Sequence, residues 1–240
     1  MINLLPAFTD ATRKLVYRIR HEVYCEELGF EPHRADGHER DEYDRHSLHC
    51  LARTAQDLVP VGCVRLVLPR PEAPGYPLPF EVACRIHPGR DNADLGRRRR
   101  HRVAEISRFA IRSPFRRRAS KKFQVLLNGN RPKGFPHFSD TPVALYLGAI
   151  ALAEANGIDT LFALSEPHLP RFFSRLGLAS TPIGGPVQHH GLRIPSVMDV
   201  RQFLSGMNPA IRPIWQAIRN EIRSHMPIPA HGWHERLAAA

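Results

Sequence analysis

The sequence predicts a mixed α/β protein that forms one continuous domain, and three observations support this fold class. Two short apolar runs separated by a turn-like segment are typical of an antiparallel hairpin. A third strand-like run at residues 103–111 precedes a long apolar helix, and a fourth strand follows that helix. Helices and strands therefore alternate along one chain without an internal repeat.

The first element is a helix over residues 10–28. Its apolar positions Val16, Ile19, Val23 and Leu28 recur at helical spacing, and Thr9 or Asp10 is a suitable cap. Gly29 is the expected stop, because glycine readily adopts the left-handed conformation that ends many helices. Residues 32–47 are polar and rich in charge, so they predict a loop that leads into the hairpin of residues 48–54 and 61–68.

The later elements follow from caps and breakers. Residues 69–79 contain five prolines and predict an irregular loop, and residues 80–96 carry no clear pattern. A helix begins at Asp140 or Thr141 and ends at Gly157; it is apolar nearly all round and is therefore expected to be buried. A strand at residues 160–164, a short helix at 170–176, strands within 183–200 and an amphipathic helix at 208–222 complete the chain.

Composition excludes several classes of protein. Of the 240 residues, 42% are hydrophobic and 24% charged, as in ordinary globular proteins. No apolar run approaches the roughly 18 residues of a membrane span, and the start lacks a signal peptide, so we expect a cytoplasmic protein. The four cysteines are too dispersed for a disulfide framework. None of the 14 histidines has the i, i+4 spacing of a zinc hydrolase, so we expect no metal.

The net charge of +11 is concentrated in two basic blocks on either side of the strand at residues 103–111. Such density predicts an acidic macromolecular partner whose approach it would steer. Aromatic residues are not interleaved with these arginines as a stacking platform for nucleic acid requires. The blocks contain Arg97, Arg98, Arg99, Arg100 and Arg102, and then Arg112, Arg116, Arg117, Arg118, Lys121 and Lys122.

A scattered set of polar and charged residues lies inside or beside apolar segments. Buried charges are costly unless they are paired, so a fold that keeps several of them in its apolar elements is expected to use them at a site. This pattern predicts an enzyme. The set consists of Arg20, Tyr24, Asp41, Asp44, Arg65, Glu105 and Arg108.

The order of elements around the strand at 103–111 resembles the GNAT acyltransferase fold. The strand reads Ala-Glu-Ile-Ser-Arg-Phe-Ala-Ile, and a basic turn, a buried helix and a strand follow it. The segment Phe-Ser-Arg-Leu-Gly-Leu at residues 173–178 then looks like that fold's recurring aromatic-x-x-x-Leu-Gly-Phe element. The resemblance implies a central mixed, mostly antiparallel sheet flanked by helices, with an acyltransferase domain at residues 1–205 and a helical tail at 206–240. The usual glycine-rich loop after the strand is replaced by Arg-Arg-Arg-Ala-Ser-Lys-Lys, which disfavours an acyl-CoA donor.

The polar residues narrow the resemblance further. Arg20-x-x-x-Tyr24, Asp41-x-x-Asp44, Arg65 and Glu105-x-x-Arg108 look like the acyl-homoserine-lactone (autoinducer) synthases. They look closer still to the related N-acyl amino acid synthases and to the acyltransferases of PEP-CTERM/exosortase systems. The autoinducer synthases carry a tryptophan between the first arginine and the aspartate pair, where this chain has only Phe30 as a comparable aromatic. An amino acid or another amine is therefore favoured over S-adenosylmethionine as acceptor.

The resemblance implies an N-acyltransferase that takes a fatty acyl chain from acyl carrier protein, a small acidic partner, and needs no metal or redox cofactor. Glu105 is the candidate general base for the acceptor amine, with Arg108 beside it. A structural ion pair between Glu105 and Arg108 is the alternative. The predicted substrate-binding residues are Arg20, Tyr24, Asp41, Asp44, Arg65 and Phe109. The predicted carrier-protein surface consists of Arg97, Arg98, Arg99, Arg116, Arg117, Arg118, Lys121 and Lys122.

Individual roles within this set stay open. Asp41 and Asp44 would hold the acceptor's ammonium, and Arg65 and Arg108 its carboxylate. Arg20 would bind substrate or order the loop that bears the aspartates. Three other functions also stay open: an acyl-homoserine-lactone synthase, an ordinary CoA-dependent GNAT acetyltransferase, and a basic nucleic-acid-binding protein.

Overall fold

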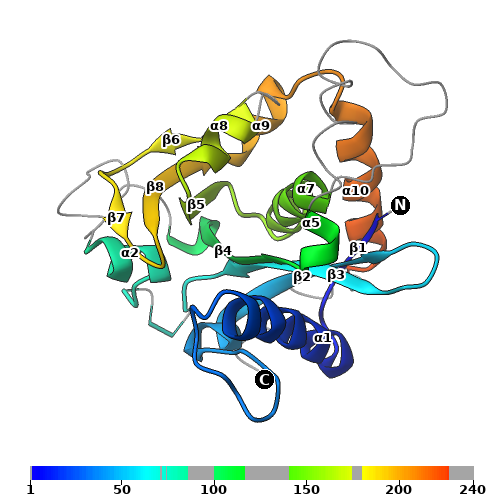
Figure 1. Ribbon diagram of the computed structural model, residues 1–240. Helices are drawn as coiled ribbons and strands as arrows, with labels where there is room; N and C mark the ends of the chain where they lie inside the picture. Colours follow the sequence, from blue (N-terminus) through cyan, green and yellow to red (C-terminus); the bar gives the residue numbers. More distant parts are fainter. Residues whose placement is uncertain are drawn as a thin grey trace.

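The computed structural model describes residues 2–70, 72–73, 75–85, 100–116, 141–174 and 180–226. These described residues form one eight-stranded sheet in the order β1-β2-β3-β4-β5-β8-β6, with β7 paired to β8 (Figure 1). All neighbouring strands are antiparallel except β4 and β5. The strands are β1 (Ile2–Pro6), β2 (Ser47–Thr54), β3 (Pro60–Val67), β4 (Val103–Ile111), β5 (Thr160–Ser165), β6 (Thr181–Pro182), β7 (Val187–Gln188) and β8 (Leu192–Asp199).

Helices cover both faces of this sheet. On one face α7 and α10 form the largest core cluster with the strands, and on the other face lie α1, its π-helical continuation η1 and the short α2 (Figure 1). The helices are α1 (Asp10–Arg20), η1 (His21–Glu27), the 3-10 turn η2 (Glu42–His46), α2 (Pro79–Cys84), the 3-10 turn η3 (Arg100–Arg102), α5 (Ser113–Arg116), α7 (Thr141–Ala155), α8 (His168–Ser174), α9 (Val200–Gly206) and α10 (Arg212–Ser224).

The mixed, mostly antiparallel sheet flanked by helices confirms the predicted fold class. The predicted hairpin is the β2–β3 pair, and the predicted helix ending at Gly157 is α7, in which 12 of 15 residues are buried. Thr9 caps α1, and Gly29 follows η1 with a φ of +62°, as the sequence predicted. The sequence did not predict η2 or α2, because both are short turns without apolar periodicity.

The described part of the predicted C-terminal tail packs into the main core. Ile214, Trp215, Ile218 and Ile222 of α10 are buried in the same cluster as α7. Arg219 of α10 also donates a bidentate pair of hydrogen bonds to Glu154 of α7 (Nε–Oε2 2.8 Å, Nη2–Oε1 2.9 Å). The predicted division at residue 205 falls within α9.

Close packing between the sheet and α7 leads to a first testable prediction at Gly62 of β3. A Cβ there would lie 2.8 Å from the backbone oxygen of Ala110 and 2.9 Å from Cδ1 of Leu145. We expect Gly62→Ala to lower the free energy of unfolding by about 1–3 kcal/mol, because a backbone oxygen cannot move aside as a side chain can. Denaturant unfolding measures the change. Gly185→Ala, which meets nothing within 4 Å, is the control, and an equal effect in both variants would contradict the prediction.

Candidate active site

A bulge in β4 positions the first residues of the site. Between the pairs Arg65–Ser107 and Cys63–Ala110, β3 has one residue and β4 has two, Arg108 and Phe109. Arg108 sits in this bulge with a φ of +48°, a conformation uncommon for a residue other than glycine. The extra residue places Ser107 and Arg108 on the same side of the sheet. On that side, arginine and carboxylate side chains form one network of ion pairs, which includes Arg108 and contacts Ser107.

The network joins three arginines from three elements, and Arg20 and Arg65 form its core. Arg20, in the last turn of α1, is paired with Glu39 through Nε and with Asp44 through Nη1 (2.6 Å). Arg65 of β3 contacts Asp44 (2.9 Å) and Asp41 (2.6 Å), and its Nε donates to Ser107 (3.0 Å).

Arg108 forms the outer end of the network. Its Nη2 lies 2.8 Å from Glu31, 3.2 Å from Glu39 and 3.3 Å from Asp41. Only 19% of its side chain is exposed, against 23% for Glu31 and 26% for Asp41. The side chains of Arg20 and Arg65 are exposed by 1% or less. Of the three arginines, only Arg108 is therefore accessible to solvent.

Arginine partners lower the pKa values of the two aspartates in the network and so keep both aspartates ionised. Burial by itself would raise the pKa of Asp44, but the Arg20 and Arg65 guanidiniums more than offset this and hold that pKa well below its usual range. Arg65 lowers the pKa of Asp41 in the same way against the effect of burial. The three guanidiniums of the network face four carboxylates, which gives a formal charge of −1 before any substrate binds. The carboxylates are those of Glu31, Glu39, Asp41 and Asp44.

Glu105 lies in a different environment on the same face of β4, about 7 Å along the strand from Ser107. It is 3% exposed, and its Oε2 accepts a hydrogen bond from the backbone N–H of Phe80 (2.8 Å). Burial raises the pKa of Glu105 to about 8. Among the described residues Glu105 forms no ion pair, so the alternative of a structural Glu105–Arg108 pair does not describe this arrangement.

An apolar cluster explains this desolvation. Glu105 is paired in register with Val67 of β3 and Phe162 of β5, and both neighbours belong to the cluster. Phe162 stacks on Phe80 with ring centroids 4.6 Å apart. The carboxyl group therefore sits where the charged network of one half of the sheet meets an apolar compartment. The buried members of that compartment are Val67, Leu78, Phe80, Val103 and Phe162.

The parallel pair β4–β5 separates beside this carboxyl group. Its last register pair is Ile106–Ala163, although β4 continues to Ile111 and β5 to Ser165. Beyond the separation, β5 remains paired with β8 as far as Ser165–Ile194. Beyond Ile106, β4 therefore has no register partner in β5, although both strands continue.

The remaining predicted residues are placed as follows. The ring of Tyr24, in η1, lies under Arg108, and the Cζ atom of Arg108 is 5.6 Å from the centroid of that ring. Burial raises the pKa of Tyr24 above its usual range. Phe109 packs against the large core cluster that contains α7 and lies away from the network. Arg116 donates to the Ile111 carbonyl (2.5 Å) and is paired with Glu27. Arg97, Arg98, Arg99, Arg117, Arg118, Lys121 and Lys122 lie outside the described residues.

Sequence reasoning missed two members of the network, Glu31 and Glu39. Glu39 opens the run Glu-Arg-Asp-Glu-Tyr-Asp that contains both predicted aspartates, and Glu31 directly follows Phe30. Their position in a polar loop gave no sign of burial, yet Glu39 is only 2% exposed. Its place as the first residue of that run is the signal that would have included Glu39.

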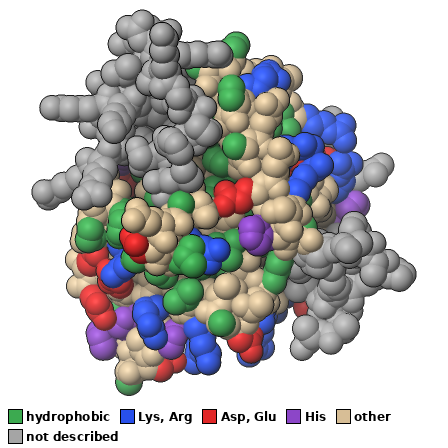
Figure 2. All heavy atoms as spheres, turned by 90° about the vertical axis from the view of Figure 1, so that its right-hand side faces the viewer, with side chains coloured by type: hydrophobic (Ala, Val, Ile, Leu, Met, Phe, Trp, Pro, Cys, Tyr) green, Lys and Arg blue, Asp and Glu red, His purple; other side chains and the backbone are tan. Residues whose placement is uncertain are grey.

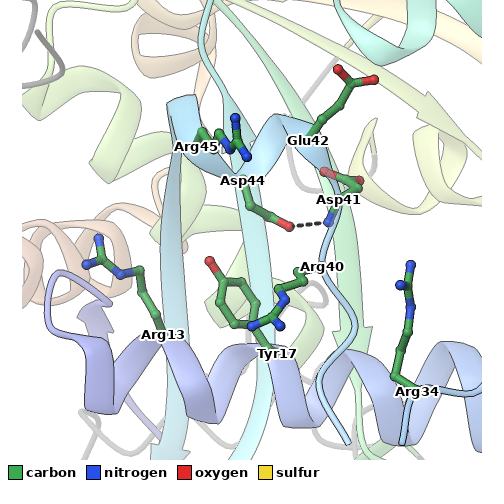
Figure 3. A pocket seen from close by; sticks show the side chains of 8 residues that line it. All are labelled: Arg13, Tyr17, Arg34, Arg40, Asp41, Glu42, Asp44 and Arg45. Atoms are coloured by element: carbon green, nitrogen blue, oxygen red, sulfur yellow. Dashed lines mark hydrogen bonds between the residues drawn. The ribbon is translucent and has the colours of Figure 1, made fainter. Parts of the chain in front are cut away.

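An open pocket of about 660 Å³ borders the outside of the aspartate pair (Figure 3). Arg13 and Tyr17 reach into it from α1, and Arg34 and Arg40 come from the loop that leads to η2 (Figure 3). Arg13 and Arg40 are paired with Asp10 and Asp36 respectively. The other lining residues are Asp41, Glu42, Asp44 and Arg45.

One group of residues in the described part of the chain has the spacing of metal ligands. Ligand atoms of His21, Glu26 and His33 lie within 4.8 Å of one another. His21 Nδ1 is 3.0 Å from Glu26, and His21 Nε2 accepts the backbone N–H of Arg34 (3.1 Å), so both ring nitrogens already have partners. The absence of a metal requirement stays a prediction.

Comparisons with known proteins agree with the fold. The family model described as an acetyltransferase (GNAT) domain matches residues 19–125. No curated protein matches the sequence. Among solved structures, the CoA-dependent acyl-homoserine lactone synthase BjaI with MTA has a TM-score of 0.61 at 20% identity and covers 100% of both chains.

Two further solved structures have the same fold. TofI, in a ternary complex with an inhibitor and MTA, has a TM-score of 0.59 at 22% identity and covers 87% of this chain and 99% of its own. FeeM, an N-acyl amino acid synthase from uncultured soil microbes, has a TM-score of 0.56 at 17% identity and covers 86% and 94%. In the described part of the chain, none of the helices is long and apolar enough to cross a membrane.

Proposed function

We propose that the chain is an acyltransferase of the GNAT type, whose family model matches residues 19–125, and that it moves a fatty acyl group from acyl carrier protein to the amine of an amino acid or a related small acceptor. The observation that carries the proposal is the placement of buried Glu105 between the charged network and the apolar cluster, where β4 separates from β5. A cytoplasmic location and a role in a PEP-CTERM/exosortase system remain parts of this proposal.

The charged network supports an amine acceptor. Its formal charge of −1 favours a cation, and its exposed end at Glu31, Asp41 and Arg108 is where an ammonium group would enter. Arg65 is 1% exposed and already holds two aspartates, so its role is to orient them rather than to bind an acceptor carboxylate. Arg20 likewise orders the loop through Glu39 and Asp44.

Glu105 supplies the proton acceptor. The ammonium must lose a proton before its nitrogen can attack the thioester carbonyl, and a base with a pKa near the working pH is best suited to take it. A C–N bond then forms, the C–S bond breaks, and the proton passes on to the departing thiolate. Backbone N–H groups of β4 beyond Ile106 are the candidate donors to the oxyanion.

The first experiment incubates the purified protein with long-chain acyl carrier protein or long-chain acyl-CoA, a pool of amino acids and S-adenosylmethionine. Mass spectrometry of the products is expected to find an N-acyl amino acid formed from the carrier-protein donor. Products from CoA alone would replace this proposal with an ordinary CoA-dependent enzyme. No product from any pair would overturn it.

An acyl-homoserine-lactone synthase is the second candidate, and the net negative network favours it specifically. S-adenosylmethionine carries a sulfonium in addition to its ammonium, so it matches a formal charge of −1 better than a neutral zwitterion does. A lactone product in the same experiment would select this candidate.

A nucleic-acid-binding function has less support. Figure 2 shows the side of the molecule on the right of Figure 1, and over its described part basic, acidic and hydrophobic side chains are interspersed rather than gathered into one basic surface. The three arginines of the network are also paired with carboxylates, and their side chains are largely buried.

The carrier-protein donor leads to a prediction for the basic blocks. We expect the double variant Arg117→Ala/Arg118→Ala to raise the KM for acyl carrier protein by about three- to tenfold, because each exposed charge pair is worth up to about 1 kcal/mol. The KM for a matched acyl-CoA should stay unchanged. Arg201→Ala, at an exposed position of α9, is the control. An unchanged KM for the carrier protein would move the docking surface elsewhere.

A further inference from the structure

The hairpin formed by β7 and β8 ends in a turn of unusual conformation. Its residues are His189, His190 and Gly191, and the His189 N–H donates to the Gly191 carbonyl (2.8 Å). His190 has a φ of +50° and Gly191 a φ of +96°. A residue other than glycine is uncommon in the left-handed region, so the contacts of the His190 ring are of interest.

The ring of His190 stacks on Phe30, with centroids 5.0 Å apart and planes at 22°. Phe30 and the next residue, Glu31, both donate their backbone N–H groups to the Tyr24 carbonyl (2.8 and 3.1 Å). Glu31 Oε1 lies 2.8 Å from Arg108 Nη2 and 3.9 Å from His190 Nε2. The Phe30–Glu31 segment is therefore held between η1 on one side and the hairpin tip on the other.

The position of the hairpin tip follows from how β4, β5 and β8 are paired. β8 is paired with β5 up to Ser165–Ile194, so the tip extends beyond the end of β5. Arg108 lies beyond the point where β4 leaves β5. At the base of the hairpin, Arg193 is 3.3 Å from Glu166, which follows β5. The tip, in the C-terminal half of the sheet, thus lies beside the outer end of the charged network, which belongs to the N-terminal half.

We propose that the tip of the β7–β8 hairpin forms the wall of the acceptor site and that His190 is a positioning residue, which holds Phe30 and Glu31 against Arg108 and so sets acceptor affinity. The proposal rests on the function proposed above. It assigns to His190 and Phe30 together the aromatic surface that borders the entering amine. Burial, together with the nearby charges of Arg108 and Arg193, lowers the pKa of the neighbouring His189.

The kinetic test uses His190→Asn, because asparagine tolerates the left-handed conformation but has no ring to stack. We expect the acceptor KM to rise about three- to tenfold, the range that an aromatic contact supports, while kcat and the donor KM change less than about twofold. Phe30→Leu should have the same effect, and the double variant should be no worse than either single one, since both lose the same contact. His168→Asn, an exposed histidine of α8, is the control.

Hydrogen exchange provides a second readout that does not depend on activity. The backbone amides of Phe30 and Glu31 should exchange faster in His190→Asn than in the wild type. In His168→Asn their exchange rates should equal those of the wild type. If the wild type yields no N-acyl product from any pair, the proposed function fails, and the exchange still tests the hairpin contact. Unchanged exchange together with unchanged acceptor KM would overturn the inference. A variant with a lower kcat, a lower Tm and raised KM values for both substrates would also overturn the inference, because such changes indicate a merely structural role.

Discussion

Glu105→Gln is expected to lower kcat by about 10²- to 10⁴-fold, because the variant keeps the shape of the side chain but cannot accept the acceptor's proton. The hydrogen bond from the Phe80 N–H can persist, since the amide oxygen of glutamine accepts it as the carboxylate does. Steady-state kinetics with saturating donor and acceptor measure the change. In the wild type, kcat/KM should rise with pH through about 8, as Glu105 ionises in the free enzyme, and this rise should be absent from the residual activity of the variant.

The same variant should be more stable than the wild type at alkaline pH. The folded-state pKa of about 8 lies above the ordinary value of 4.5, so between these values the folded state holds a proton that the unfolded state has released. Wild-type stability therefore falls as pH rises through this window, and glutamine removes that loss. We expect a gain on the order of 1–4 kcal/mol at pH 8.5 and almost none at pH 4.5. Thermal unfolding at both pH values checks it.

The two measurements on Glu105 separate catalysis from structure. A general base predicts lost turnover together with gained stability, whereas a carboxyl group needed for folding predicts losses in both. Ser107→Ala, on the same face of β4, is the matched control, because it removes only the hydroxyl that accepts from Arg65. Full turnover in Glu105→Gln would refute the assignment of the base.

Asp44→Asn is expected to give the largest loss of stability, about 3–5 kcal/mol. Asp44 accepts hydrogen bonds from Arg20 and Arg65, whose side chains are 0% and 1% exposed, and from the backbone N–H of Asp41 (2.7 Å). The substitution removes the carboxylate that the buried Arg20 and Arg65 share, so both guanidiniums lose a charged partner, and removal of one member of a buried pair costs about this much. A drop in Tm of about 10 °C follows for a chain of this size.

The pH dependence of this loss tests its cause. The pKa of Asp44 is depressed in the folded state, so the stability it contributes is present above the ordinary value of 3.8 and is lost as pH falls through the folded-state value. The difference between wild type and Asp44→Asn should therefore shrink below about pH 4. Glu42→Gln is the control in the same 3-10 turn. Its side chain is 61% exposed, so a change below about 1 kcal/mol is expected. Equal losses in the two variants would contradict the buried-network account.

Local signals carried much of the fold prediction. The helix that ends at Gly157 is apolar all round, and nearly all of α7 is buried, because a segment with no polar face must lie inside. The β2–β3 hairpin and β4 were predicted for the same reason, since short apolar runs bounded by turn residues leave few alternatives. The turns η2 and α2 were missed, because each depends on a cap and on contacts with distant residues rather than on periodicity.

The candidate site divides in the same way. Arg20, Asp41, Asp44, Arg65 and Arg108 were predicted from charges set in apolar surroundings, and the structure brings all five into one network. Phe109 was also predicted as a substrate-binding residue, but the bulge puts Ser107 and Arg108 on one side of the sheet, and Phe109 packs on the other side against the large core cluster. Such a bulge depends on the pairing of β3 with β4, which no single segment encodes.

The sequence by itself determined the layered α/β architecture, the buried helix and the residue types of the charged network. Periodicity, caps and the cost of burying charge act over a few residues and can therefore be read locally. Only the tertiary structure decided that Glu39 is buried, that Glu105 lies against an apolar cluster and that His190 meets Phe30 across 160 positions of the chain. These features depend on which distant segments pack together, because burial and pKa are set by neighbours in space.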